Sequence, residues 1–265
     1  MSEKRNSPFG FKNWRKDPDE WDSTIIAVSP YSLKDLAMAP RDESRQPQPE
    51  SVVEQNFKIR LAYSQERVNN ASMLIQRMYM KRGYDVPGML KVPDRITLMA
   101  SQNEAVVGTL TLGMDSGNGL MADENYKKEV DQLRADGRKV CELTKFAVDQ
   151  VHGSKRVLAG LFHIAYIYGR VLHNQTDVVI EVTPRHALFY KRMLGFEPFG
   201  EERLNTRVHT MGVLLRLEID YVDQQIARWG GKTDADATKS ERSLYPYFFS
   251  KEDEAGIVQR LLRDD

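Results

Sequence analysis

The sequence predicts an α+β fold in which a mixed, mostly antiparallel sheet is flanked by helices. Three patterns support this prediction: strand-period and helix-period segments alternate, two neighbouring strands read as a hairpin, and one long helix separates two apolar strands. Hairpin strands pair antiparallel, whereas strands joined by a helical crossover pair parallel, so both kinds of pairing are expected in one sheet.

The chain divides into three predicted parts. Residues 1–50 hold six of the eleven prolines and dense charge, so we expect an irregular, proline-rich N-terminal arm in which Thr24–Val28 could still dock on the body. The main domain is expected over residues 51–231. Residues 232–265 are expected to form a polar linker and a C-terminal helix.

Periodicity sets the elements of the main domain in order. Alternating apolar and polar residues predict strands, while apolar residues three and four apart predict helices. Ser154 is the expected N-cap of the long helix, and Gly83 ends the first helix. The expected strands cover residues 57–63, 96–100, 105–114, 139–149, 178–182, 196–201 and 207–218. The expected helices cover residues 66–81, 123–134, 154–172, 185–194, 221–229 and 252–262.

Composition excludes several classes of function. The chain has 38 basic and 38 acidic residues, and this balance argues against a nucleic-acid-binding protein. A single cysteine, Cys141, cannot form an internal disulfide. No apolar run approaches the ~20 residues that span a bilayer, and no signal-peptide pattern is present. We therefore expect a cytoplasmic protein with no transmembrane segment and no bound metal.

Two segments carry the strongest motif. The first reads Cys-Glu-Leu-Thr-Lys-Phe-Ala-Val-Asp from Cys141 to Asp149. In the second, from Glu181 to Phe196, an apolar strand ends at Pro184 and a short helix follows. Together they resemble the acyl-binding half of the GNAT-type N-acyltransferases. The resemblance implies that the strands before and after the long helix splay apart to admit a thioester.

Glu142 is the candidate catalytic base. Acyl transfer to an amine needs a base for the amine, donors for the developing oxyanion and a proton for the leaving thiolate. In a regular strand Glu142 would lie among largely apolar neighbours, which would desolvate its carboxyl group and raise its pKa. The alternative role is a salt bridge to Lys145 or to a neighbouring strand. The predicted neighbours on this face are Val140, Thr144, Phe146 and Val148.

Four other side chains have candidate roles at the same site. Tyr190 is the candidate acid for the thiolate, or else a core tyrosine. Thr144 could hold the amine or a water molecule, and Lys145 could bind substrate if a β-bulge turned it onto the face of the base. Arg185 could bind a substrate carboxylate or phosphate at a helix N-terminus, where His186 is either a substrate-binding or a capping residue.

The start of the long helix is a candidate phosphate site. Ser154, Lys155 and Arg156 combine backbone amides with two cations. The loop pattern of acetyl-CoA-using GNAT enzymes is missing at residues 151–159, which favours the single phosphate of a phosphopantetheine arm over coenzyme A. An acidic carrier protein would face basic residues. The candidates are Arg138, Lys139, Lys155, Arg156, Lys191 and Arg192.

The strand from Glu142 to Asp149 is also similar to the Glu-x-Ser-Arg-Phe-x-Val-Asp strand of acyl-homoserine-lactone synthases. With the helix from Val157 to Tyr166 and the segment from Thr176 to Phe196, the chain resembles the long-chain N-acyl amino acid synthases of the FeeM type. This resemblance implies transfer of a long acyl chain from acyl carrier protein to the α-amine of an amino acid, with no permanently bound cofactor.

A long acyl chain also needs an apolar tunnel. Its candidate lining, which would otherwise be ordinary core, is Met73, Met78, Met80, Leu98, Leu110, Leu112, Leu161 and Phe162. Two other functions remain open from the sequence. One is a GNAT enzyme that uses acyl-CoA on a small amine or a protein N-terminus, and the other is a non-catalytic module that binds acyl chains or a carrier protein.

Overall fold

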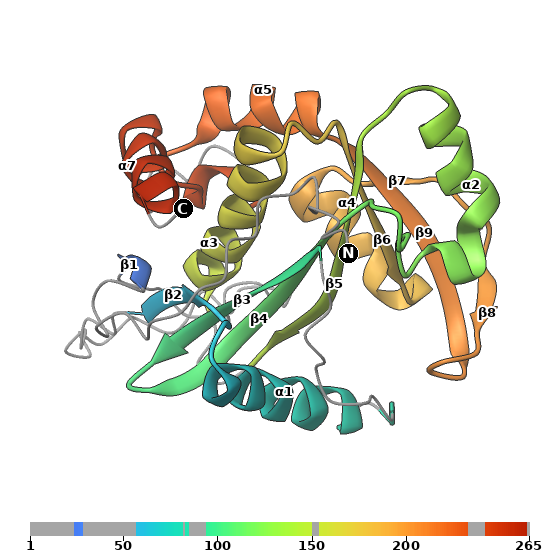
Figure 1. Cartoon of the computed structure of the whole chain (residues 1–265), viewed down its shortest axis with the longest axis horizontal. Coiled ribbons are helices and arrows are strands. Elements are labelled where there is room, and N and C mark those ends of the chain that lie inside the picture. Colours follow the sequence, from blue (N-terminus) through green and yellow to red (C-terminus); the bar gives the residue numbers. More distant parts are fainter. Residues whose placement is uncertain are drawn as a thin grey trace, which may run out of the picture.

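The computed structural model describes residues 24–28, 57–81, 83–84, 94–149, 154–232 and 242–263. Within these residues, nine strands form one sheet in the order β1-β2-β3-β4-β5-β6-β9-β7, with β8 pairing to β9 (Figure 1). The strands are β1 (Thr24–Val28), β2 (Phe57–Leu61), β3 (Arg95–Gln102), β4 (Ala105–Met114), β5 (Val140–Val148), β6 (Asp177–Val182), β7 (Glu197–Pro198), β8 (Arg203–Asn205) and β9 (Thr210–Glu218). The helices are α1 (Gln65–Met80), α2 (Asp123–Ala135), α3 (Lys155–Tyr166), η2 (Ile167–Leu172), α4 (Pro184–Leu194), α5 (Ile219–Trp229), η3 (Tyr245–Tyr247) and α7 (Lys251–Arg263).

The sheet is mixed, as predicted. β5 and β6 pair parallel, joined by the α3 crossover, and the other described pairs are antiparallel. Inside the N-terminal arm, Thr24–Val28 docks on the body as an edge strand on β2, with a shift of register between Thr24 and Ile26. The linker predicted from residue 232 falls largely outside the described residues.

Two predicted elements differ in extent. The strand expected over residues 196–201 is reduced to β7, and the strand expected over residues 207–218 begins only at Thr210 because residues 206–209 form the turn between β8 and β9. The predicted long helix is present, but its last six residues, Ile167–Leu172, are a π-helix. Ser154 is its N-cap, as expected, and accepts a hydrogen bond from the Val157 amide.

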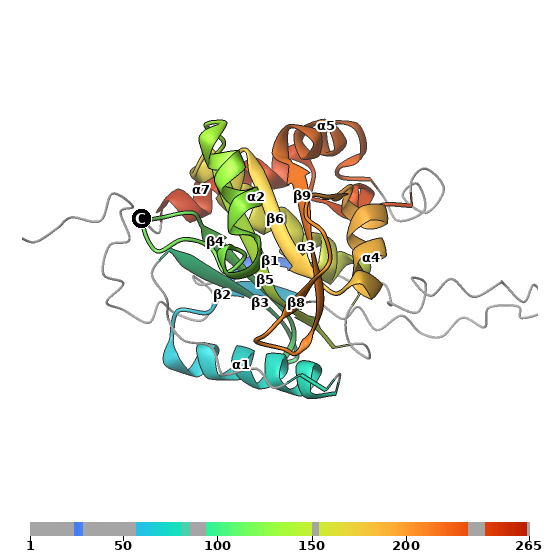
Figure 2. The ribbon, with the colours of Figure 1, turned by 90° about the vertical axis from the view of Figure 1, so that its right-hand side faces the viewer.

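Helices cover both faces of the sheet. Figures 1 and 2 show α1 on one side, with α3 and α5 on the other. Side-chain alternation along β5 places α2 on the α1 side: Cys141 and Leu143 join the large core against α3, while Val140 packs with α2 and Ala147 packs with α1. The residues of β5 between Val140 and Ala147 that point to this face therefore lie on the part of the sheet between α1 and α2.

A β-bulge interrupts this alternation. Thr111 of β4 pairs with Thr144 and Thr109 pairs with Ala147, so β5 carries one extra residue in between. Lys145, at φ 50°, takes the left-handed conformation there. The extra residue reverses the faces of the residues that follow it, and Phe146 packs with the α3 core. The prediction that Phe146 and Val148 share the face of Glu142 was therefore wrong.

The C-terminal segment closes the α3 side of the fold. Buried His163 on α3 accepts a hydrogen bond at Nδ1 from the Phe249 amide, 2.9 Å away, and its Nε2 lies 2.8 Å from Glu254 of α7. The ring of His163 stacks on Phe248 and Phe249. His163 thus joins α3 to the C-terminal segment inside the protein. Among the described residues, no helix is long and apolar enough to cross a bilayer.

Candidate active site

The parallel strands β5 and β6 pair over only three residues. Val140 lies opposite Asp177, Cys141 opposite Val178 and Glu142 opposite Val179, and the pairing then stops. Both strands continue, β5 to Val148 and β6 to Val182, with β4 and β9 as their outer partners. The predicted splaying of the central strands is therefore confirmed, and Glu142 lies at the point where they part.

Glu142 is held at this point by backbone amides. Its side chain is 1% exposed, and its two carboxylate oxygens accept hydrogen bonds from the amides of Met121 (2.7 Å) and Ala122 (2.9 Å), in the turn that opens α2. Burial raises the pKa of Glu142 to about 7, although these amides and the charges of Arg95 and Arg207 oppose the rise. A carboxyl group with this pKa is about half ionised at neutral pH, which suits a general base.

Two predicted site residues lie beside it. Thr144 is on the same face of β5, and its buried Oγ1 has no hydrogen-bond partner among the described residues. Half-buried Lys145 sits in the bulge, where its carbonyl accepts a hydrogen bond from Thr109 Oγ1 at 3.0 Å. Burial lowers the pKa of Lys145, and the nearby charge of Arg95 lowers it further. No ion pair joins Lys145 to Glu142 within the described chain, so the salt-bridge alternative does not hold in this conformation.

Tyr190 lies on the other side of the sheet. It is 6% exposed and packs edge-on against Phe146 (6.4 Å between ring centroids), Phe162 (6.5 Å) and Phe196 (5.9 Å). Tyr190 and the Glu142 carboxylate therefore approach the split from opposite faces. The role of Tyr190 as an acid stays a prediction.

The remaining predicted residues lie at the open end of the split. Ser154, Lys155 and Arg156 begin α3, with Lys155 Nζ 5.6 Å from the Tyr247 ring, while residues 150–153 lie outside the described chain. Arg185 is exposed in the first turn of α4. Six residues separate Glu142 from the end of β5, which is roughly 20 Å at the strand rise.

His186 has a side-chain contact in the same turn of α4. Its Nδ1 lies 2.8 Å from Thr183 Oγ1, beside the amides that open the helix. The contact joins two side chains, and no side-chain hydrogen bond caps the start of α4, so both the capping and the substrate-binding roles of His186 stay predictions.

The six basic residues proposed to face a carrier protein do not form one surface. Arg138 precedes β5 at the paired end and donates to fully buried Asp177 at 2.5 Å, and Arg216 also binds that carboxylate. Lys155 and Arg156 follow β5 at the open end. The nine residues of β5 span roughly 30 Å, so only part of the set can meet one partner patch.

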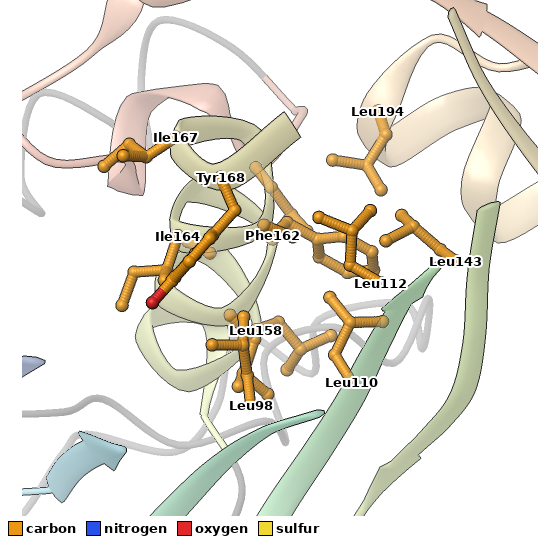
Figure 3. Close-up of a cluster of buried hydrophobic side chains, with 14 of the residues drawn as sticks. Leu98, Leu110, Leu112, Leu143, Leu158, Phe162, Ile164, Ile167, Tyr168 and Leu194 are labelled. Atoms are coloured by element: carbon orange, nitrogen blue, oxygen red, sulfur yellow. The ribbon is translucent and has the colours of Figure 1, made fainter. Parts of the chain in front are cut away.

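An apolar cavity lies on the α3 side of the sheet, directly under the paired part of β5 and β6. The cavity is narrow in this structure: only about 40 Å³ of it is open to the centre of a water-sized molecule. Figure 3 shows Leu112, Leu143, Phe162 and Leu194 converging there. The lining also includes Cys141, Ala165, Tyr166, Gly169, Val178, Phe196, Leu217, Ile219, Val222, Tyr245 and Phe248.

Of the residues predicted to line an acyl tunnel, Leu112 and Phe162 line this cavity, and the tunnel itself stays a prediction. Met73 and Met80 are 67% and 68% exposed on α1 and do not reach this side of the sheet. The other predicted lining residues (Met78, Leu98, Leu110 and Leu161) belong to the packed core. Residues around the cavity on α5 and η3 were missed because long-range packing has no local sequence signal.

The residues that surround Glu142 were also missed. The turn at Met121 and Ala122 has no motif that predicts a carboxylate partner, and Arg95 reaches the site only through the register of β3 on β4. No cluster of three or more potential metal ligands occurs among the described residues.

Comparison with known proteins assigns the family. Residues 70–218, more than half of the chain, match the family model described as N-acyl amino acid synthase FeeM. Among curated proteins, no sequence matches this chain. The solved structure of FeeM, an N-acyl amino acid synthase from uncultured soil microbes, is 23% identical and aligns over 62% of this chain and 90% of its own, with a TM-score of 0.57.

Two more distant structures also align. The acyl-homoserine-lactone synthase LasI is 13% identical over 62% of this chain and 91% of its own (TM-score 0.45). An acyl-CoA N-acyltransferase from Pseudomonas aeruginosa is 16% identical over 61% of this chain and 98% of its own (TM-score 0.43). The predicted GNAT-type fold is confirmed by the likeness to FeeM. The chain belongs to the FeeM family of N-acyl amino acid synthases and is an N-acyltransferase.

Proposed function

We propose that this enzyme transfers a long-chain acyl group from the phosphopantetheine arm of acyl carrier protein to the α-amine of an amino acid. The observation that carries the proposal is the position of Glu142, a buried carboxyl group at the point where β5 and β6 part. A thioester that enters the split from its open end would bring its carbonyl carbon to this group.

The chemistry follows from the state of the amine. The α-amino group of a peptide has a pKa of roughly 8, and the carboxylate of a free amino acid raises the pKa of its own amine further, so less than about a tenth of the acceptor is neutral at pH 7. The amine nitrogen attacks the thioester carbonyl carbon and passes its proton to Glu142. The carbon–sulfur bond then breaks and the thiolate leaves, protonated by Tyr190 in our proposal, which regains its proton from solvent. Glu142 needs to supply only a modest gain, for which a carboxyl pKa of about 7 is well matched.

The apolar cavity supports a long acyl group. It begins against Cys141 and Leu143 of β5 and Val178 of β6, beside the residues that mark the split. Its walls are almost entirely apolar, and burial of an acyl chain there is favoured in proportion to its area. Because only about 40 Å³ is open in this structure, a long chain would enter as the lining side chains move apart.

The donor is proposed from the open end of the split. The N-terminus of α3, with Lys155 and Arg156, offers amides and two cations for one phosphate. Acyl carrier protein carries such a phosphate on its phosphopantetheine arm. Its surface is acidic and would be attracted to the cations at this end of the split. The buried free thiol of Cys141 and the lack of any disulfide partner fit the cytoplasm as the proposed location.

The test is an assay of purified protein with matched donors and acceptors. Long-chain acyl carrier protein, the same acyl group on coenzyme A, and acetyl-CoA are each combined with a panel of amino acids, and products are identified by mass spectrometry. We expect N-acyl amino acids from the carrier-protein donor, a rate loss of about 10²- to 10⁴-fold in Glu142→Gln, and no loss in the exposed control Glu252→Gln.

Other outcomes would select the alternatives. Faster reaction with acyl-CoA would assign the donor to coenzyme A. Binding of acyl carrier protein without turnover, and with no effect of Glu142→Gln, would leave only a binding module and contradict the proposal.

A further inference from the structure

A polar strip crosses the sheet surface between α1 and α2. The row Arg95–Gly113–Glu142 runs across β3, β4 and β5, and the next row on the same face consists of three threonines. Apolar packing resumes on either side, with Val140 under α2 and Ala147 under α1. The strip consists of Arg95, Thr97, Thr111, Glu142, Thr144 and Lys145. Thr97 and Thr111 hydrogen-bond to each other at 2.7 Å, and Glu142 to two backbone amides, so within the described residues the polar groups of the strip that need a partner are those of Arg95, Thr144 and Lys145.

Arg95 crosses β4 at a glycine. A Cβ atom at Gly113 would lie 3.6 Å from Arg95 Cγ and 3.8 Å from its Nε, so the arginine side chain runs over the bare backbone of β4 in the direction of Glu142. Arg95 is half-buried, yet no carboxylate within the described residues forms an ion pair with it. By contrast, Arg207, which also acts on Glu142, is paired with Glu124 and Glu181.

Lys145 adds a second unpaired cation. The bulge reverses alternation at this residue, and Lys145 is half-buried with no acidic partner among the described residues. Its pKa is lowered by burial first and by the charge of Arg95 second, which shows that the two cations act on the same space. Two half-buried cations that lower each other's stability are costly unless an anion joins them.

Glu142 is not that anion. Both of its oxygens are already engaged by the Met121 and Ala122 amides, and neither cation is within ion-pair distance of it in the described structure. The buried Thr144 Oγ1, which lacks a partner there, is a further polar group directed at the same region. The strip therefore offers a proton acceptor and, beside it, a place for a negative group.

We propose that Arg95 and Lys145 bind the carboxylate of the acceptor while Glu142 takes the proton from its amine. The inference rests on the proposed function and names how the acceptor is recognised. An α-amino acid carries its amine and its carboxylate on one carbon, so both must be met by neighbouring side chains, as this strip provides. Arg95 supplies a planar fork suited to a carboxylate, and Lys145 a point charge. A simple amine would lack the group that these two cations require.

The experiment compares each amino acid with its own primary amide, which keeps the amine and removes the negative charge. Wild type should acylate the acid with a much lower KM than the amide. Arg95→Gln and Lys145→Met should each raise the KM for the acid by about 10- to 100-fold, the effect of losing a hydrogen bond to a charged group, and leave the KM for the amide unchanged. Loss of the Arg95 charge also acts on the pKa of Glu142, so the kcat of acid and amide should change together in Arg95→Gln. Arg95→Lys should recover part of the preference.

The matched control is Arg228→Gln, an exposed arginine on α5, which should behave as wild type. The proposal is wrong if the acid-to-amide preference in KM survives in Arg95→Gln and Lys145→Met, or if the KM of both substrates rises equally. Thermal unfolding of each variant identifies loss of folding. If Arg95→Gln does not fold, Lys145→Met decides the question, and if Lys145→Met does not fold, Arg95→Gln decides it. If wild type acylates neither acid nor amide, the proposed function fails, which is a separate result.

Discussion

Replacing Glu142 by glutamine should alter the pH dependence of stability. The ordinary pKa of 4.5 applies in the unfolded chain, and burial raises it to about 7 in the fold. The folded state therefore holds the proton more tightly, so the unfolding free energy contributed by this group falls as pH rises from 4.5 to about 7 and stays low above. At 1.36 kcal/mol per pH unit, the fall is roughly 3 kcal/mol.

Glutamine does not titrate, so the variant lacks this dependence. Glutamine also places its NH₂ group against one of the two backbone N–H groups, so one hydrogen bond is lost. This loss lowers the free energy of unfolding by about 1–3 kcal/mol at every pH. Urea unfolding of wild type, Glu142→Gln and Glu252→Gln between pH 4.5 and 8 measures both effects. The free energy of unfolding of wild type minus that of Glu142→Gln should fall by roughly 3 kcal/mol as pH rises across this range. Parallel curves would refute the reasoning, because they would mean that the pKa of Glu142 is not raised.

Activity should respond to pH in the opposite direction. The ionised form of Glu142 is the base, so kcat/KM of wild type should rise with pH through about 7. The amine of the amino acid adds its own rise above roughly pH 8 with both proteins, because its carboxylate raises the pKa of the amine above that of a peptide N-terminus. Glu142→Gln should keep only the second rise, and an identical profile in both would exclude Glu142 as the base.

Three further predictions test the surroundings of the site. Ala165→Leu places a larger side chain in the apolar cavity and should shift the preferred donor toward shorter acyl chains in a competition among saturated chain lengths; an unchanged preference would place the chain elsewhere. Asp177→Asn should lower the free energy of unfolding in urea at pH 7 by about 1–3 kcal/mol, because it removes the carboxylate that binds Arg138 and one of the two that bind Arg216, the other being Glu218. Burial alone would raise the pKa of Asp177, but its arginine hydrogen bonds outweigh burial and hold the pKa below the ordinary value of 3.8. The contribution of Asp177 to the free energy of unfolding should therefore be lost as pH drops below 3.8. His163→Leu removes the acceptor of the Phe249 amide and should speed hydrogen exchange in the C-terminal segment, a change that would be missing if that segment were held by apolar packing alone.

Local pattern predicted most of the fold. The periodicity of β2, α1, the β3–β4 hairpin and α5 was sufficient to place them, since each is set by residues near in sequence. The parting of β5 and β6 was inferred from family resemblance and is confirmed by their short pairing. The bulge could not be predicted, because it depends on the register of β5 against β4, and it alone explains the wrong face assigned to Phe146.

The site was predicted only in part for the same reason. Glu142 was identified from its strand motif, but its amide partners lie in a turn about 20 residues earlier in the chain. Arg95 reaches the strip through two strand pairings that no local spacing encodes. Arg138 looked like a surface cation because its partner, Asp177, is 39 residues away.

Mass spectrometry of lipid extracts from cells that express wild type, Glu142→Gln or Glu252→Gln tests the central claim most directly. A carboxyl group at the mouth of two separated strands should generate a lipid-linked amino acid in the wild type and the Glu252 variant, with little or none in the Glu142 variant. Equal amounts of that product in all three strains, or its absence from all of them, would contradict this account.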